Sequence, residues 1–219
     1  MYHLPLGTEN LFSREFASAT DPARLLRAIL TNRSQLVDLG EAFSPGDASP
    51  TPYALMCSIG PDAGVIRRLH ATRTGAISHL HYLRPTWEEV RDPALPRLTI
   101  QVDGRRIVDA QRGMAIIANS RHYGARMNPA CDARVDDGLL DVVFFPAESG
   151  PAALLWMLRS FAGVHTSHRE CTIARGRTVQ VASDQPLPHQ FDGELGHRQT
   201  TSLDFETRPA ALRVLLPAD

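Results

Sequence analysis

The sequence has few cysteines, little net charge and no long apolar run, and each shortage excludes a class of protein. Its three cysteines, Cys57, Cys131 and Cys171, are widely spaced, so they form neither a CxxC metal motif nor a disulfide framework. The formal net charge of -1 leaves no general basic face for nucleic acid. No run approaches the roughly 18 apolar residues of a membrane span, and the first residues lack the basic and apolar regions of a secretory signal. We therefore expect a cytoplasmic protein that binds no nucleic acid and touches membranes only peripherally.

The 219 residues, 43% of them hydrophobic and 21% charged, can bury a large core. From Ser34 onward the apolar residues fall in short segments, rich in Val and Ile, with turn signals between them. Asp103-Gly104 is such a signal, typical of a two-residue hairpin. The pattern predicts an α+β, mainly β fold: a β-sandwich with a few peripheral helices. We expect strands at 53–59, 98–102, 139–145, 169–174, 178–182, 187–191, 199–205 and 212–216.

Helical spacing appears in four places, of which the first is a helix expected to begin at Glu9 with Leu11, Phe12 and Phe16 on its apolar face. Thr20 or Asp21 caps a helix with Pro22 at its first position, and residues 61–83 carry an apolar stripe. A further helix follows Ser149-Gly150-Pro151 and ends near Gly163. Its expected core face consists of Leu154, Leu155, Leu158 and Phe161.

The stretch Asn119–Asp141 is a long connection between two expected core strands, and a loop of this length is usually functional or disordered. It holds an exposed-looking Tyr123 and four aspartates: Asp132, Asp136, Asp137 and Asp141. Carboxylates and backbone carbonyls suit a hard cation such as Mg²⁺ or Ca²⁺ better than zinc. The alternative is that Asp136-Asp137-Gly138 is only a turn that leads into a strand.

Three separated pieces matter together: Pro5-Leu6-Gly7-Thr8-Glu9-Asn10, the loop with its Asp-Asp-Gly-Leu-Leu-Asp, and Phe191-Asp192-Gly193-Glu194. In this order they resemble the diacylglycerol kinase-like lipid kinases, which include bacterial diacylglycerol and YegS-type kinases and the sphingosine and ceramide kinases. Ser58-Ile59-Gly60-Pro61-Asp62-Ala63 also resembles the small-residue segment of the family around a Gly-x-Asp. The order and spacing of the pieces make the resemblance fairly specific, although each alone is weak. The chain departs from many members at Asn10-Leu11, where they have Asn-Asp.

The resemblance implies a kinase that transfers the γ-phosphate of ATP to a lipid hydroxyl. Members have an N-terminal α/β, NAD kinase-like domain that binds nucleotide and a C-terminal β-sandwich domain, with the active site between them. By this resemblance, residues 1–33 are a helical remnant of the first domain and residues 34–219 are the second. The Gly-Gly-Asp-Gly-Thr nucleotide motif of the family does not occur in this sequence, and we expect it upstream of Pro5 in a longer enzyme.

The resemblance also implies roles for the matching residues in nucleotide binding and catalysis. It makes Glu194 the catalytic base that takes a proton from the lipid hydroxyl, and Gly7 and Thr8 contacts of the nucleotide phosphates. The alternatives remain open. Asp192-Gly193 can be a plain hairpin turn with Glu194 solvated beside it, and Thr8 can be a plain helix cap.

The magnesium site implied by the resemblance lies in the central loop. Its ligands would be the carboxylate of Asp137 and the backbone carbonyls of Arg134 and Leu139, with water in the other positions. The site would order the loop and not take part in the transfer itself.

Two functions remain open for the chain itself. One is an ATP- and Mg²⁺-dependent lipid kinase whose acceptor is diacylglycerol, sphingosine or a similar lipid. The other is a non-catalytic lipid-binding or regulatory module, because the nucleotide motif is absent from these residues; a mis-assigned start codon would explain the same absence. An exposed strand edge beside an incomplete first domain also predicts a homodimer.

Overall fold

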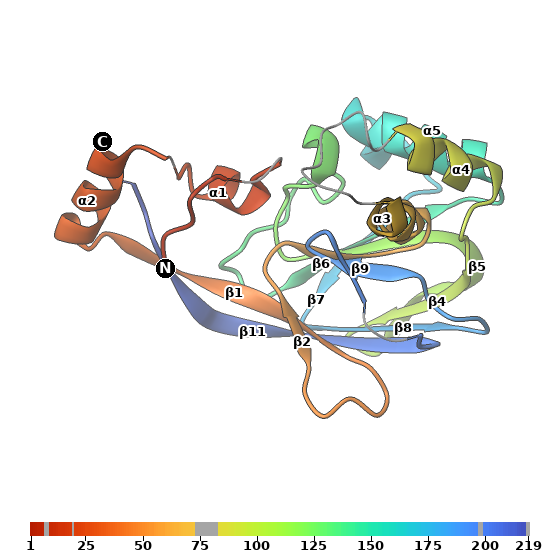
Figure 1. The fold of residues 1–219 in the computed structure, drawn as a ribbon. Helices are drawn as coiled ribbons and strands as arrows, with labels where there is room; N and C mark the ends of the chain where they lie inside the picture. Colours follow the sequence, from red (N-terminus) through yellow and green to blue (C-terminus); the bar gives the residue numbers. More distant parts are fainter. Residues whose placement is uncertain (7–8, 19, 73–82, 197–198, 218–219) are drawn as a thin grey trace.

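Strand β5 (Arg105–Ala118) connects the two layers of a curled antiparallel sheet (Figure 1). Its first half pairs with β4 (Arg97–Val102), and its second half pairs with β3 (Met56–Ile59) and β6 (Leu140–Pro146). The computed structural model describes residues 1–6, 9–18, 20–72, 83–196 and 199–217. The predicted mainly β sandwich is confirmed.

Both layers are antiparallel throughout. The first has the order β2-β1-β11-β8-β4-β5, and its further members are β1 (Ser34–Phe43), β2 (Thr51–Tyr53), β8 (Thr178–Ser183) and β11 (Ser202–Leu215). The second has the order β10-β9-β3-β5-β6-β7, and its further members are β7 (Thr172–Gly176), β9 (His189–Phe191) and β10 (Glu194–Leu195).

The main core lies between the layers. In β8 the residues alternate, so that Val179 and Val181 are buried while their neighbours face out, which is the period of a half-buried strand. They belong to one buried cluster with Val142 and Phe144 of β6 in the other layer. Strand β6 is buried on both faces, because its alternate residues lie in a second cluster on the outer side of its layer. This explains why residues 139–145 read as an almost continuous apolar run, interrupted only by Asp141.

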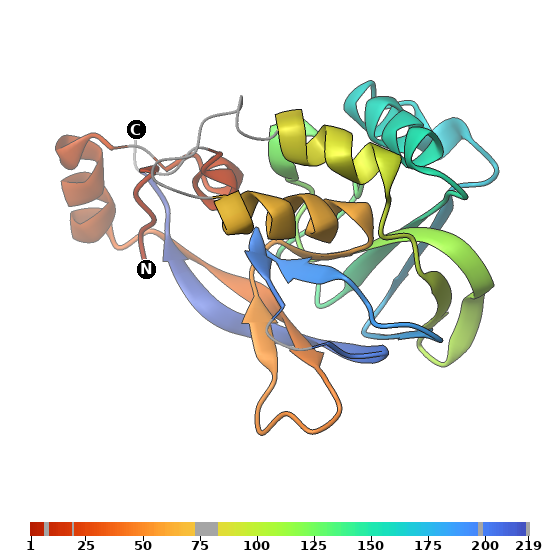
Figure 2. The same ribbon diagram turned by 45° about the vertical axis from the view of Figure 1, so that its right-hand side comes forward.

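Three helices lie over that outer side: α3 (Pro61–Thr72), α4 (Leu83–Arg91) and α5 (Gly150–Phe161), as Figures 1 and 2 show. Residues 73–82, part of the helical segment expected at 61–83, lie outside the described residues. Short 3₁₀ turns cover Gly124–Arg126 and His165–Ser167.

Helix α5 turns a different face to the core from the one expected. Ser149 accepts a hydrogen bond from the backbone N–H of Ala152, as an N-cap does. Trp156 stacks on Phe145 with 5.1 Å between ring centroids, and its indole N–H donates to the carbonyl of Pro146 at 2.7 Å. The residues expected inside are instead exposed: Leu154, Leu155, Leu158 and Phe161. That expectation was wrong because the helix is apolar on both sides, and the fit of one tryptophan decides which side packs.

The remaining helices, α1 (Leu11–Glu15) and α2 (Pro22–Thr31), lie at the other end of the molecule, beside the ends of β1 and β11 (Figure 1). Asp21, not Thr20, caps α2, since its carboxylate accepts the N–H of Ala23 at 2.9 Å. The boundary between 33 and 34 stays a prediction. No helix in the described parts of the chain is long and apolar enough to cross a bilayer.

Candidate functional site

The candidate site is built around the hairpin that joins β9 and β10. Asp192 (φ 50°) and Gly193 (φ 94°) both have left-handed backbone, and Glu194 pairs with Phe191 across the turn. This is the geometry of a two-residue type I′ hairpin, which favours Asp-Gly. Glu194 is the first residue of β10 and is exposed.

The carboxylate of Asp192 fastens this hairpin to the segment 54–56. It accepts three backbone N–H groups, from Ala54 at 2.7 Å and from Leu55 and Met56 at 2.9 Å each. Burial raises the pKa of Asp192, and the three N–H donors oppose that rise. Its oxygens are therefore occupied in holding the turn.

A polar cluster ties the hairpin to the start of α3. The side-chain amide of Gln190 donates to Ser58 Oγ at 3.0 Å and to Asp62 Oδ2 at 2.9 Å, and its oxygen accepts the N–H of Gly193 at 2.6 Å. Ser58 donates to Asp62 at 2.6 Å. Tyr123, expected to be exposed, is buried beside this cluster, and burial together with Asp62 raises the pKa of its hydroxyl. The polar cluster thus fixes the turn before Glu194 through the hydrogen bond between Gln190 and Gly193.

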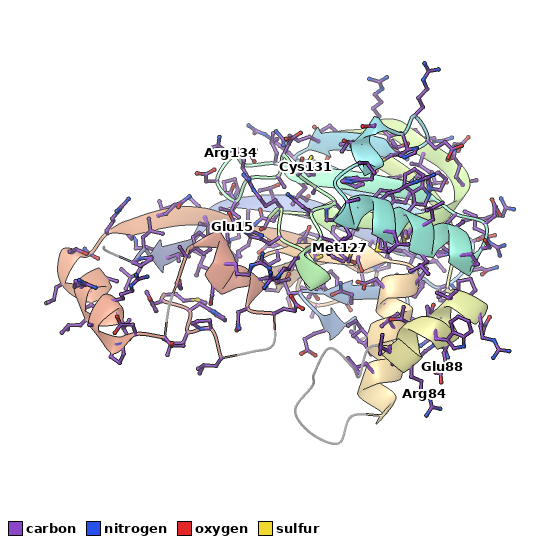
Figure 3. All side chains as sticks on the ribbon, turned by 90° about the horizontal axis from the view of Figure 1, so that it is seen from above. Glu15, Arg84, Glu88, Met127, Cys131 and Arg134 are labelled. Carbon is purple, nitrogen blue, oxygen red and sulfur yellow. The ribbon has the colours of Figure 1, made fainter. Side chains whose placement is uncertain are left out.

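Hydrogen bonds also connect α1 and the start of the central loop to segment 54–56. Asn119 donates its side-chain amide to the carbonyl of Ala54 at 2.9 Å, and the N–H groups of Asn119 and Ser120 donate to the carbonyl of Leu55. Ser120 Oγ donates to Glu15 of α1 at 2.5 Å. Figure 3 shows Glu15 on α1 beside the loop that carries Met127 and Arg134. Segment 54–56 therefore holds the β9–β10 hairpin and the start of the central loop, and Ser120 connects that part of the loop to α1.

The second half of the central loop is held by Asp38, a buried residue of β1. Its carboxylate accepts the N–H of Gly138 and the N–H of Ala210, both at 2.7 Å, and its own N–H donates to the carbonyl of Val135. These bonds lie where the pairing of β1 with β11 shifts register, between Val37 and Leu39. Asp38 therefore joins the loop to both long strands.

The loop offers oxygen donors that fit a hard cation. Asp137 Oδ1 accepts the N–H of Leu139 at 3.1 Å, and Oδ2 lies 3.8 Å from Arg175 Nη1. Arg175 donates to Asp141 Oδ1, whereas Asp141 Oδ2 is buried and has no hydrogen-bond partner among the described residues. Unpartnered carboxylate oxygen suits magnesium. The described residues contain no group of three or more His, Cys, Asp and Glu side chains that could hold a metal, so carbonyls and water would have to complete the shell.

The sites predicted from the sequence fall in different places. Arg134, Asp137 and Leu139 lie in one turn of the central loop, and Glu194 lies on the separate hairpin. Gly7 and Thr8 lie outside the described residues. A groove of about 570 Å³ runs past the loop, and its lining residues do not include Glu194: Leu36, Asp38, Asp136, Asp137, Gly138, Arg177, Thr207, Pro209 and Ala210.

Sequence reasoning missed the supporting residues. Gln190 and Asp38 bind partners more than 90 positions away in the chain, so no local pattern reveals them. The signal for Gln190 is a buried polar residue in the short strand His189–Phe191, which directly precedes the Asp-Gly turn.

Comparison with known proteins supports the same family. Residues 56–216 match the family model described as the YegS C-terminal NAD kinase beta sandwich-like domain. This chain belongs to the YegS-like lipid kinase family. A YegS-like "probable lipid kinase" of Pseudomonas putida is 30% identical over 217 residues, which cover 98% of this chain and 68% of that protein. One of Stenotrophomonas maltophilia is 26% identical with the same coverage.

Solved structures share the fold of this YegS-like chain. A protein of Bacillus anthracis str. Sterne, described as a candidate diacylglycerol kinase, superposes with a TM-score of 0.70 at 15% identity. The match covers 96% of this chain and 66% of the Bacillus chain. The chain thus spans about two thirds of the length of the relatives it matches.

Proposed function

We propose that this chain forms the lipid-accepting lobe of a kinase that transfers the γ-phosphate of ATP to the hydroxyl of a lipid such as diacylglycerol or sphingosine. The observation that carries the proposal is the fixed hairpin that presents Glu194 in a chain of the YegS-like family. Asp192 is already occupied by three backbone N–H groups, so Glu194 is the carboxylate of this motif that faces outward.

In the proposed reaction Glu194 takes the proton of the lipid hydroxyl. The hydroxyl oxygen forms a bond to the γ-phosphorus, the bond from that phosphorus to the bridging oxygen breaks, and ADP leaves. The cluster under Gly193 keeps the hairpin in place, which matters because phosphoryl transfer depends chiefly on positioning. Gly7 and Thr8 are proposed to contact the nucleotide phosphates.

The proposed magnesium ligands are the Asp137 carboxylate and the carbonyls of Arg134 and Leu139, with Asp141 Oδ2 as a further oxygen close by. A magnesium ion there would supply the positive charge that orders the loop. Asp38, through Gly138, holds the same turn from the strand side.

The test is transfer of radiolabel from ATP to diacylglycerol, sphingosine or ceramide in detergent micelles by the purified protein. Glu194→Gln keeps the shape of the side chain and removes the base, so we expect activity to fall by about a hundredfold or more. Glu170→Gln, an exposed glutamate ahead of β7, is the matched control and keeps wild-type activity. Equal activity of Glu194→Gln and wild type would remove Glu194 from the mechanism.

A non-catalytic lipid-binding or regulatory module is the second candidate, favoured by the absence of Gly-Gly-Asp-Gly-Thr from these 219 residues. Titration calorimetry with ATP and magnesium separates the two candidates. Heat of ATP binding favours the kinase, and lipid binding without ATP binding favours the module.

A further inference from the structure

The outer face of α5 is apolar where a surface helix is normally polar. Leu158 is 57% exposed and Phe161 is 66% exposed, and three neighbouring apolar residues are exposed to a lesser extent: Leu154 and Leu155 of the helix and Val164 just after it. The only charged residue in the helix is Arg159. Exposed apolar patches of this kind mark protein or membrane contacts.

Helix α4 extends this face. Trp87 is 64% exposed, and the exposed stripe of α4 also contains Leu83, Arg84 and Arg91. The backbones of the two helices are closely packed where Gly150 of α5 meets Val90 of α4. A Cβ at position 150 would lie only 1.9 Å from the carbonyl oxygen of Val90, so no side chain fits there. Figure 2 shows them next to each other on the same side of the sheet. We call the exposed stripes of the two helices the α4/α5 face.

Charges of both signs border this face: Arg84, Arg91 and Arg159 on the two helices, and Glu88 and Asp92 on and directly after α4. Arg84 pairs with Glu88 at 2.8 Å, and Arg159 lies over the Trp156 ring, 4.8 Å from its centroid. No described acidic side chain forms an ion pair with Arg91 or with Arg159. Leucine and aromatic side chains bordered by arginines are the composition of helices that lie in the interface of an anionic membrane.

We propose that the α4/α5 face docks on an anionic lipid bilayer, with Trp87 and Phe161 inserted at the level of the headgroups. The proposal rests on the proposed function in one respect: a bilayer is where the lipid substrate resides. A second copy of the chain fits this face less well, because two copies would bring the same arginines together. The patch also lies at the other end of the molecule from α1 and α2 (Figure 1).

The experiment is sedimentation with sucrose-loaded vesicles of phosphatidylcholine, with or without about 25% phosphatidylglycerol. We expect the wild type to bind the anionic vesicles and to dissociate as salt is raised. The affinity of the double variant Leu158→Ser with Phe161→Ser for these vesicles should be lower by about tenfold or more. The matched control is Leu26→Ser with Leu30→Ser on α2, whose leucines are 56% and 74% exposed; it should bind as the wild type does.

A second measurement uses the intrinsic fluorescence of Trp87 in the wild-type protein as the probe of membrane contact. The chain has two tryptophans, and Trp156 is buried. Brominated lipid should therefore quench Trp87 in the wild type and leave the emission of Trp87→Phe almost unchanged. Arg91→Gln with Arg159→Gln, checked for folding by circular dichroism, should lower binding and weaken its salt dependence.

Failure of the wild type to bind anionic vesicles would overturn the proposal, as would full binding by the Leu158→Ser, Phe161→Ser variant. A dimer in light scattering that this variant converts to a monomer would also overturn it, because the face would then belong to a second copy. None of these readouts requires phosphoryl transfer. Loss of the proposed kinase activity therefore leaves the result standing.

Discussion

At the residue scale, Asp192 and Glu194 lie two positions apart and meet different surroundings. Asp192→Ala removes the acceptor for three backbone N–H groups, and we expect the free energy of unfolding to fall by about 2–4 kcal/mol. Glu194→Ala, at an exposed position, should change it by less than about 0.5 kcal/mol. Urea denaturation followed by fluorescence measures both. Similar losses in the two variants would contradict the structural role given to Asp192.

His122 gives a pH dependence at the contact between α1 and the central loop. Burial lowers its pKa, while Glu15, 3.7 Å away, acts in the opposite direction. The unfolded chain, with a pKa of about 6.5, therefore binds the proton first as the pH falls. The free energy of unfolding should decrease as the pH falls through about 6.5 towards the lower pKa of the folded state.

His122→Gln removes this titration, so its urea midpoint should fall less between pH 7.5 and pH 5.5 than that of the wild type. His168→Gln removes a histidine elsewhere and serves as the control. An identical pH profile in His122→Gln and the wild type would rule out a contribution from His122.

At the element scale, the β9–β10 hairpin depends on its glycine. Gly193 has φ 94°, and a Cβ placed there would meet no atom within 4 Å. A side chain at this position is therefore unfavourable only because of the left-handed backbone conformation and not because of a clash. Gly193→Ala should lower the free energy of unfolding by about 1 kcal/mol. Gly124→Ala is equally free of contacts and does not need a positive φ, so it should be neutral or slightly stabilising. Thermal unfolding separates the two variants.

The same elements show how far the sequence could predict the structure. The Asp103-Gly104 hairpin was predicted, and Asp192-Gly193 was left open as one, because a type I′ turn is a local property; Asp103 and Gly104 do have positive φ. The buried face of α5 was not predicted correctly. The helix carries apolar residues on all sides, and only the packing of Trp156 against Phe145 selects the side that is buried. Tyr123 is buried in a cluster with residues distant in the chain, such as Met56 and Trp156, so its burial has no local signal. The roles given to Glu194 and to the magnesium ligands stay predictions.

At the scale of the whole molecule, the described helices expose large apolar side chains in two separate places, the α4/α5 face and α2. On α2 the exposed residues are Leu26, Ile29 and Leu30. The sequence predicted a homodimer on the ground of an exposed strand edge, and we predict that the exposed side chains of α2 take part in it. Light scattering should show self-association that Leu26→Ser with Leu30→Ser abolishes and Leu158→Ser with Phe161→Ser leaves intact. A monomer at all concentrations would contradict this expectation.

Strand β5 contributes hydrogen bonds to both layers of the sandwich, with β4 on one side of its midpoint and β3 and β6 on the other. Peeling either layer away would break the strand that the other layer needs, so melting in separate halves is disfavoured. The hairpin with Glu194 is attached through β9 to β3. It consequently belongs to a single unit that unfolds cooperatively.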